Sequence, residues 1–107
     1  MITINIYYTG KNGSAKRFAE EMISSGIVAK IKAEDGNLGY DYFYSQADEE
    51  TVLLIDSWKD QTALDVHHAS PMMKEISSLR EKYDLHMKVN RFTSIDDNLG
   101  DERFIRK

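Results

Sequence analysis

The segment Ala33–Met73, AEDGNLGYDYFYSQADEETVLLIDSWKDQTALDVHHASPMM, decides the fold of this chain. Its first part alternates tyrosines with other residues over Leu38–Tyr44, which is the period of a β-strand. Thr51–Trp58 is apolar almost throughout, as expected for a strand at the centre of a sheet. The short acidic turn between them, Ala47–Glu50, predicts that the two strands form a β-hairpin.

Two helices are predicted in the second half of this segment. Asp60 is a good N-cap for a short helix that carries Ala63, Leu64 and His67. Ser70-Pro71 then has the pattern of a second helix start, with serine as the N-cap and proline at the first helical position. The buried stripe of this second helix is expected to consist of Met72, Ile76, Leu79 and Tyr83.

Three further elements complete the predicted order. Ile2–Tyr8 alternates as a strand, and Leu85–Phe92 does so again near the end of the chain. Between Ala15 and Ile31 the apolar residues have helical spacing, with Ser14 as a candidate N-cap and Gly26 as a point where the helix bends or loosens. The order β-α-β-β-α-β defines an α+β, ferredoxin-like fold.

Length and composition predict one domain. The 107 residues form a single unit, 1–107, with a core of about residues 2–95 and a charged tail, 96–107, in which Phe104 and Ile105 remain able to dock, for example on a partner subunit. The acidic turns at 48–50 and 96–97 are interpreted as solvated loops. The glycine-rich turn at 10–13 lacks the phosphate-loop pattern.

Charge and residue usage exclude several functional classes. The net charge is −4 and the lysines and arginines are scattered, which argues against nucleic-acid binding. No segment has the length of a membrane-spanning helix, and the N-terminus lacks the features of a signal peptide. The absence of cysteine rules out disulfides and thiolate ligands and fits a cytoplasmic protein. The three histidines do not have the spacing of a known metal site, so no metal is expected.

At this point the chain resembles the antibiotic biosynthesis monooxygenase family of the dimeric α+β barrel superfamily. The resemblance runs from about Ile2 to Ile95. Its carriers are the stretch 34–40 (EDGNLGY), Trp58 at the end of a strand, and then Ala63-Leu64, His67 and Ser70-Pro71. It implies a homodimer in which two four-stranded sheets face each other, with a pocket between sheet and helices in each subunit.

The resemblance also implies a reaction. Better-known members oxidise phenols or quinols with O₂ and use no metal, flavin or haem, because a deprotonated, electron-rich phenolate passes an electron to oxygen itself. Such an enzyme supplies a base and a dry cavity. Haem-degrading relatives share an asparagine, a second tryptophan and a histidine at spacings that fall here on Ile6, His67 and Ser77, so haem degradation is not expected. Leu54 replaces an asparagine of some quinone-forming members.

The leading catalytic candidate is His67, which matches the family histidine and has the right chemistry to take a phenolic proton. The alternative is a histidine at a helix end that bonds to backbone or lies at an interface. Trp58 is interpreted either as a pocket wall that stacks on an aromatic substrate or as a large core residue. His68 points about 100° away from its neighbour on a helix and is not expected to share its site.

The other substrate-binding candidates lie on the predicted strands: Asn5, Tyr7, Tyr40, His86 and Arg91. Tyr40, with Tyr42 and Tyr44, forms either a polar aromatic lining together with Asn5 or Tyr7, or part of the dimer barrel. His86 either pairs with His67 or faces the dimer or solvent. Arg91 either holds an anionic substrate or forms an ion pair between subunits.

Three functions remain open from the sequence. The first is a cofactor-independent monooxygenase that acts on a phenolic or quinol-type compound with O₂. The second is a non-oxidative, isomerase-type enzyme that uses the same acid–base pocket on a small carbonyl compound or sugar phosphate. The third is a ligand-binding module without chemistry.

Overall fold

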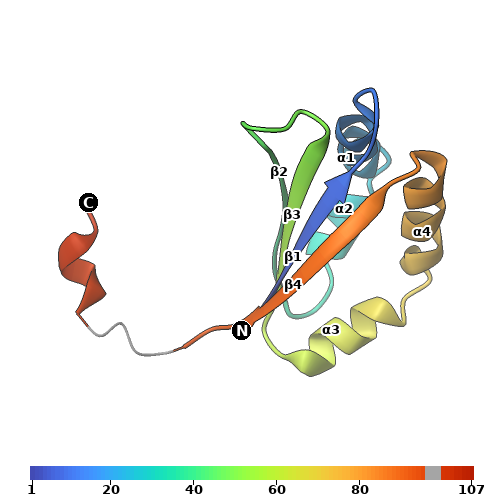
Figure 1. Cartoon of the computed structure of the whole chain (residues 1–107). Helices are drawn as coiled ribbons and strands as arrows, with labels where there is room; N and C mark the ends of the chain where they lie inside the picture. The colour runs from blue at the N-terminus through green and yellow to red at the C-terminus, as the bar shows by residue number, and fades with distance from the viewer. Residues whose placement is uncertain (96–99) are drawn as a thin grey trace.

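The computed structural model describes residues 1–95 and 100–107 and contains one four-stranded antiparallel sheet with helices on one side (Figure 1). The strands are β1 (Ile2–Thr9), β2 (Asn37–Tyr44), β3 (Thr51–Trp58) and β4 (His86–Thr93), in the spatial order β2-β3-β1-β4. The helices are α1 (Ser14–Ser24), α2 (Ile27–Lys32), α3 (Gln61–His68) and α4 (Met72–Lys82). The α+β, ferredoxin-like prediction is confirmed, and Thr51–Trp58 is a central strand as expected.

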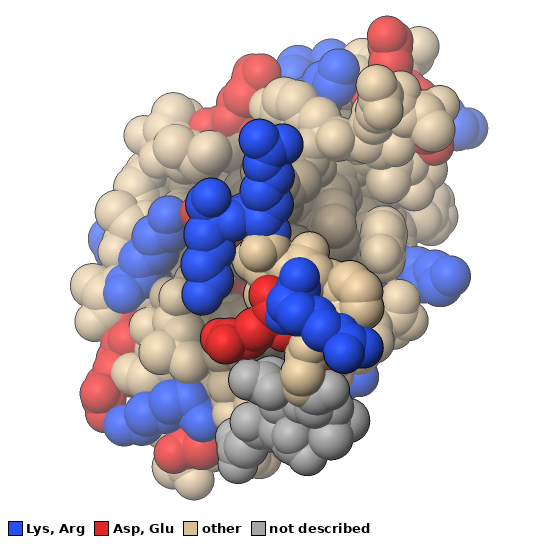
Figure 2. Space-filling view, turned by 90° about the vertical axis from the view of Figure 1, so that its left-hand side faces the viewer, with Lys and Arg blue, Asp and Glu red and all other residues tan. Residues whose placement is uncertain are grey.

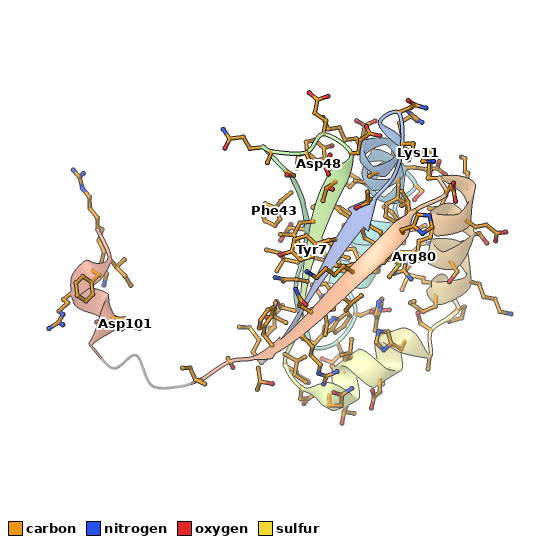
Figure 3. All side chains as sticks on the ribbon, in the orientation of Figure 1. Tyr7, Lys11, Phe43, Asp48, Arg80 and Asp101 are labelled. Atoms are coloured by element: carbon orange, nitrogen blue, oxygen red, sulfur yellow. The ribbon has the colours of Figure 1, made fainter. Side chains whose placement is uncertain are left out.

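The core lies between the helices and one face of the sheet. Ile4, Ile6 and Tyr8 point from β1 toward the helices, and the register pairs them across from Asp56, Leu54 and Val52 on β3. Phe18 and Met22 of α1 and Ile76 of α4 pack against this face and are almost fully buried. Within residues 1–95 and 100–107, no helix covers the opposite face of the sheet, where Phe43 remains 49% exposed (Figures 1 and 3).

The predicted helix over 15–31 is two helices. Gly26 adopts a left-handed backbone conformation with φ 86° and separates α1 from α2, so the expected weak point is a complete break. Ser14 is the first residue of α1, not its N-cap. Gly13 holds the cap position, and the Ser14 hydroxyl accepts a hydrogen bond from the backbone N–H of Lys11.

Of the two predicted serine and aspartate caps after β3, one is confirmed and one is wrong. The Asp60 side chain accepts a hydrogen bond from the Ala63 N–H at 2.9 Å and caps α3. At the start of α4 the cap position belongs to Pro71, and the buried hydroxyl of Ser70 has no hydrogen-bond partner among the described residues. Ile76 is buried on the predicted stripe of α4, and the three other predicted residues pack partly buried against the core.

The C-terminal residues that the structure describes lie away from the sheet (Figures 1 and 3). A short 3-10 helix, η1 (Asp101–Phe104), follows Gly100. Phe104 and Ile105 are 77% and 58% exposed in the single chain. The predicted acidic loop at 96–97 lies outside the described residues.

Two surface properties bear on function. The face of the molecule in Figure 2 carries charged side chains of both signs among uncharged ones. Among the described residues, no helix is both long and apolar enough to span a bilayer.

Candidate active site

A cavity of about 300 Å³ lies between the helix side of the sheet and helices α3 and α4. Its apolar lining consists of Ile4, Ile6, Leu64, Met73, Ile76, Met87 and Val89. Its polar lining consists of Tyr40, Asp56, His67, His68, Arg80 and Arg91. A mostly apolar hollow with a few convergent polar groups has the properties of a small-molecule site.

His67 occupies the centre of this arrangement and is only 3% exposed. Its Nδ1 forms a hydrogen bond of 2.7 Å with Oε2 of Glu34, which comes from the turn before β2. Its ring stacks on the buried indole of Trp58, with centroids 4.7 Å apart and an angle of 28° between the planes. The carboxylate and the indole together fix the position and the plane of the imidazole.

The second ring nitrogen of His67 is the one available for chemistry. Nε2 has no hydrogen-bond partner among the described residues, yet it is not among their fully buried unpaired polar atoms. Since Nδ1 is engaged by an anionic acceptor, the favoured neutral form carries its proton on Nδ1 and leaves Nε2 unprotonated. An unprotonated imidazole nitrogen in a largely apolar cavity can accept a proton from a bound ligand.

Trp58 and Asp56 form a second pair beside the imidazole. The indole N–H of Trp58 donates a hydrogen bond to Oδ1 of Asp56. Burial raises the pKa of the Asp56 carboxyl above its ordinary value, although this hydrogen bond and the nearby positive charges act in the opposite direction. Trp58 itself is fully buried beneath His67 and does not line the cavity. It therefore supports the imidazole from behind.

Two guanidinium groups provide positive charge at the cavity. Arg80 of α4 donates from Nε and Nη2 to the buried hydroxyl of Tyr8, at 3.2 and 2.9 Å. Arg91 of β4 lines the cavity as well and donates to the side-chain carbonyl of Gln61. The pKa of the Tyr8 hydroxyl is raised by burial, and the charge of Arg80 partly opposes this. Tyr8 thus stays a neutral acceptor for the arginine.

Tyr40 lies on the cavity wall and is 2% exposed. Its ring meets that of Tyr42 edge to face, with centroids 5.9 Å apart, and burial raises the pKa of both hydroxyls. Tyr40, Tyr42 and Tyr44 do share one strand face, but it is the face toward the helices. The interpretation that they pack in a sheet-to-sheet barrel is therefore wrong.

Three of the predicted site residues lie on the other side of the sheet. Asn5 and Tyr7 alternate with the buried isoleucines of β1, and His86 pairs with Thr9 in the register of β4. All three point to the face without helices. The prediction that Tyr40 lines a pocket together with Asn5 or Tyr7 is therefore wrong. The prediction that His86 pairs with His67 is wrong as well. The physical reason is the strict alternation of a strand, which places neighbours on opposite faces.

Several residues of the site were not predicted from the sequence. His68 lines the same cavity as His67, with ring centroids 5.7 Å apart, although a separation of about 100° on the helix had argued against this. Asp56 had a usable signal, because it is a charged residue at a buried position of an apolar strand. Glu34 belongs to the stretch 34–40 that carries the family resemblance, but no role was assigned to it, and Arg80 carried no comparable pattern. Among the described residues, no cluster of three or more His, Cys, Asp or Glu side chains has the arrangement of a metal site.

Comparison with known proteins agrees with this architecture. The chain belongs to the antibiotic biosynthesis monooxygenase family, whose model matches residues 1–78. The matched part includes His67, Glu34 and Trp58, whereas β4 with Arg91 lies beyond it.

The sequence identity to individual known proteins is low. The chain is 31% identical over 68 residues to the Bacillus subtilis (strain 168) protein named "Putative monooxygenase YcnE", a match that covers 64% of this chain and 70% of YcnE. The structure of a Deinococcus radiodurans protein that bears the same family name superimposes with a TM-score of 0.79 at 15% identity, covering 91% of this chain and 95% of that one. The cofactor-independent oxygenase SnoaB from Streptomyces nogalater, solved as a point mutant, gives a TM-score of 0.73 at 15% identity, with coverage of 91% and 95%.

Proposed function

We propose that this protein is a cofactor-independent monooxygenase that oxidises a small phenolic or quinol-type compound with O₂. The observation that carries the proposal is the imidazole of His67, which is bonded to Glu34 at Nδ1 and lines a largely apolar cavity, and we assign Nε2 as the atom that meets the ligand there. Membership of the family and the name of YcnE support an oxygenase reaction.

In the proposed reaction His67 removes the phenolic proton. Transfer to Nε2 leaves an electron-rich phenolate, which reduces O₂ directly, so that the substrate itself supplies the electrons. Conversion of a phenol with a para hydrogen to a para-quinone consumes one O₂ and releases one water. One oxygen atom becomes the new carbonyl, and the other leaves as water with two hydrogens from the substrate.

The charges around the cavity suit the intermediates of this reaction. Phenolate and reduced oxygen are both anionic, and Arg80 and Arg91 place positive charge at the same cavity. The aliphatic part of the lining lowers the local polarity, which strengthens these interactions, while Met87 and Val89 of the lining are 41% and 52% exposed in the single chain. Tyr40, which lines the cavity with its ring centroid 6.5 Å from that of His67, is assigned to substrate contact.

The same proposal includes a homodimer formed through the face of the sheet without helices. Phe43 and Phe92 are 49% and 52% exposed on that face, and Leu53 and Ile55 of the central strand are only half-buried in the single chain. A broad sheet face with apolar side chains is normally covered, and a second copy of the sheet would do so. Asn5, Tyr7 and His86 would then lie at the subunit interface.

The two arginines also favour a second candidate function. A non-oxidative isomerase acting on an anionic carbonyl compound, such as a sugar phosphate, uses the same base at His67 and the same cations. The two candidates differ in their need for O₂.

The test is oxygen consumption with a panel of hydroxylated naphthalenes and benzenediols, measured against enzyme-free blanks because these compounds autoxidise. Repeating the reaction under ¹⁸O₂ with a hydroxynaphthalene that has a hydrogen para to its hydroxyl is expected to place one labelled atom in the quinone. Consumption equal to the blank across the panel, or a quinone whose new oxygen comes from water, would contradict the monooxygenase proposal.

A further inference from the structure

His67 lies between two hollows. One is the inner cavity already described. The other is an outer groove of about 360 Å³. Its lining includes His67, Glu34, Asp35, Lys59, Asp60 and Val66. The hydrogen bond between His67 and Glu34 therefore connects the inner cavity with the outer groove, which Glu34 lines with a side chain that is 18% exposed.

The backbone holds Glu34 in place at this position. The turn that carries Glu34 comes directly after α2. The Glu34 N–H donates a hydrogen bond of 3.0 Å to the Ile31 carbonyl, which fixes the start of the turn to the end of that helix. Two residues later, the carbonyl of Gly36 accepts a hydrogen bond from the Lys59 N–H at 2.8 Å. The turn is thus tied to the junction between β3 and α3, which is the segment that leads to His67.

The neighbouring carboxylate provides a contrast. Asp35 lines the same groove, but its side chain is 97% exposed and its ion pair with Lys59 spans 3.5 Å. In the part of the chain that the structure describes, no hydrogen bond or ion pair joins Asp35 to the imidazole. Of the two adjacent acids, only Glu34 is partly buried and bonded to the site.

We propose that Glu34 is a positioning residue with a second role: it keeps the His67 proton on Nδ1 and passes that proton to water in the outer groove when Nε2 receives one from the ligand. This inference rests on the proposed function for the identity of the ligand as a phenol. The positioning by Glu34 concerns the free protein and holds without any ligand.

The proton balance of this step is closed. The phenolic O–H bond breaks, its electron pair stays on oxygen, and the proton bonds to Nε2. The Nδ1–H bond breaks, and that proton moves to Oε2 of Glu34 and on to water in the outer groove. The ring remains neutral. When oxygen is later reduced to water, Nε2 returns its proton and Nδ1 is reprotonated by the reverse route. Proton exchange thus continues while the ligand fills the inner cavity.

The first test is the tautomer of His67 in the free protein, read from ¹⁵N–¹H correlations of the imidazole rings. The chain has three histidines, so the His67 signals are identified by their loss in His67→Gln. The expected result is a proton on Nδ1 in the wild type and in Asp35→Ala, and a shift of the proton toward Nε2 in Glu34→Ala. A wild-type ring protonated on Nε2, or the same tautomer in Glu34→Ala as in the wild type, would overturn the inference.

The second test uses 4-nitrophenol, whose phenolate absorbs visibly and which resists further oxidation. At a pH where the free probe is mostly protonated, the wild type and Asp35→Ala are expected to bind it as phenolate and release one proton to the buffer. Glu34→Ala is expected to lose this ionisation. Equal ionisation in Glu34→Ala would refute the proton route. Absence of binding to the wild type would count against phenols as ligands of the cavity, and the tautomer measurement would still decide the role of Glu34.

Discussion

Gly36 provides a quantitative test of how the site is assembled, through the substitution Gly36→Ala. This residue has φ 83°, a left-handed conformation that costs an alanine about 1–2 kcal/mol. An added Cβ would also lie 2.6 Å from the Cβ of Ala63 on α3, which is closer than real carbon atoms approach. Overpacking of this kind typically destabilises the folded state by about 1–3 kcal/mol. The free energy of unfolding is therefore expected to fall by roughly 2–5 kcal/mol.

Gly26→Ala is the matched control, because Gly26 has nearly the same φ, 86°, and no atom within 4 Å of an added Cβ. It isolates the backbone strain and is expected to cost only about 1–2 kcal/mol. Both variants are compared by urea unfolding with the m-values checked for equality.

Removal of the opposing methyl group completes the cycle. Ala63→Gly alone weakens α3 by about 0.5–1 kcal/mol. In the Gly36→Ala background the same change also removes the steric part of the cost, so the coupling energy of the double-mutant cycle should be about 1–3 kcal/mol. If Gly36→Ala costs no more than Gly26→Ala, or if the double variant is simply additive, the close packing of this turn on α3 is not as described.

Two further predictions concern charge and assembly. Burial raises the pKa of Asp56 in the folded chain. At a pH between the ordinary and the raised pKa, the folded state therefore binds more protons than the unfolded state. The stability of the wild type falls as the pH rises through that window. Asp56→Asn retains an oxygen acceptor for the indole of Trp58, so its stability relative to the wild type should increase from about pH 3 to about pH 7 in urea unfolding, and a difference independent of pH would contradict this. Phe43→Glu should shift the protein toward monomer in sedimentation equilibrium, whereas Tyr44→Glu, at a similar exposure on the opposite face of β2, should not; equal behaviour of the two variants would remove the proposed dimer face.

The fold could be predicted well because its signals are local. The run Thr51–Trp58 predicted β3 with both ends correct, since an apolar strand between polar turns has few alternatives. The Asp60 cap was also found, because an N-cap acts within a few residues. The break at Gly26 was placed correctly but predicted too weakly. The sequence spacing does not reveal that a left-handed residue divides two helices there.

The site could be predicted only in part, because it depends on which strand face meets the helices. The period of β1 showed that Asn5 and Tyr7 face away from their isoleucine neighbours, but not which of the two faces lines the cavity. In the structure, the isoleucines line the cavity together with Tyr40. His67 was found through its place in the family pattern. Its partner Glu34 is 33 positions away in the sequence, and no local rule relates the two. Contacts of this kind arise from tertiary packing alone.

The most direct test of the central claim compares the rate of oxygen consumption of the wild type, His67→Ala and His86→Ala with the best phenol of the panel. General base catalysis contributes about 10²–10⁴-fold, so His67→Ala should lose at least 10²-fold while remaining folded. His86 lies on the opposite face of the sheet, and its removal should leave the rate close to that of the wild type. Undiminished turnover in His67→Ala would contradict the assignment of His67 as the base and, with it, the proposed mechanism.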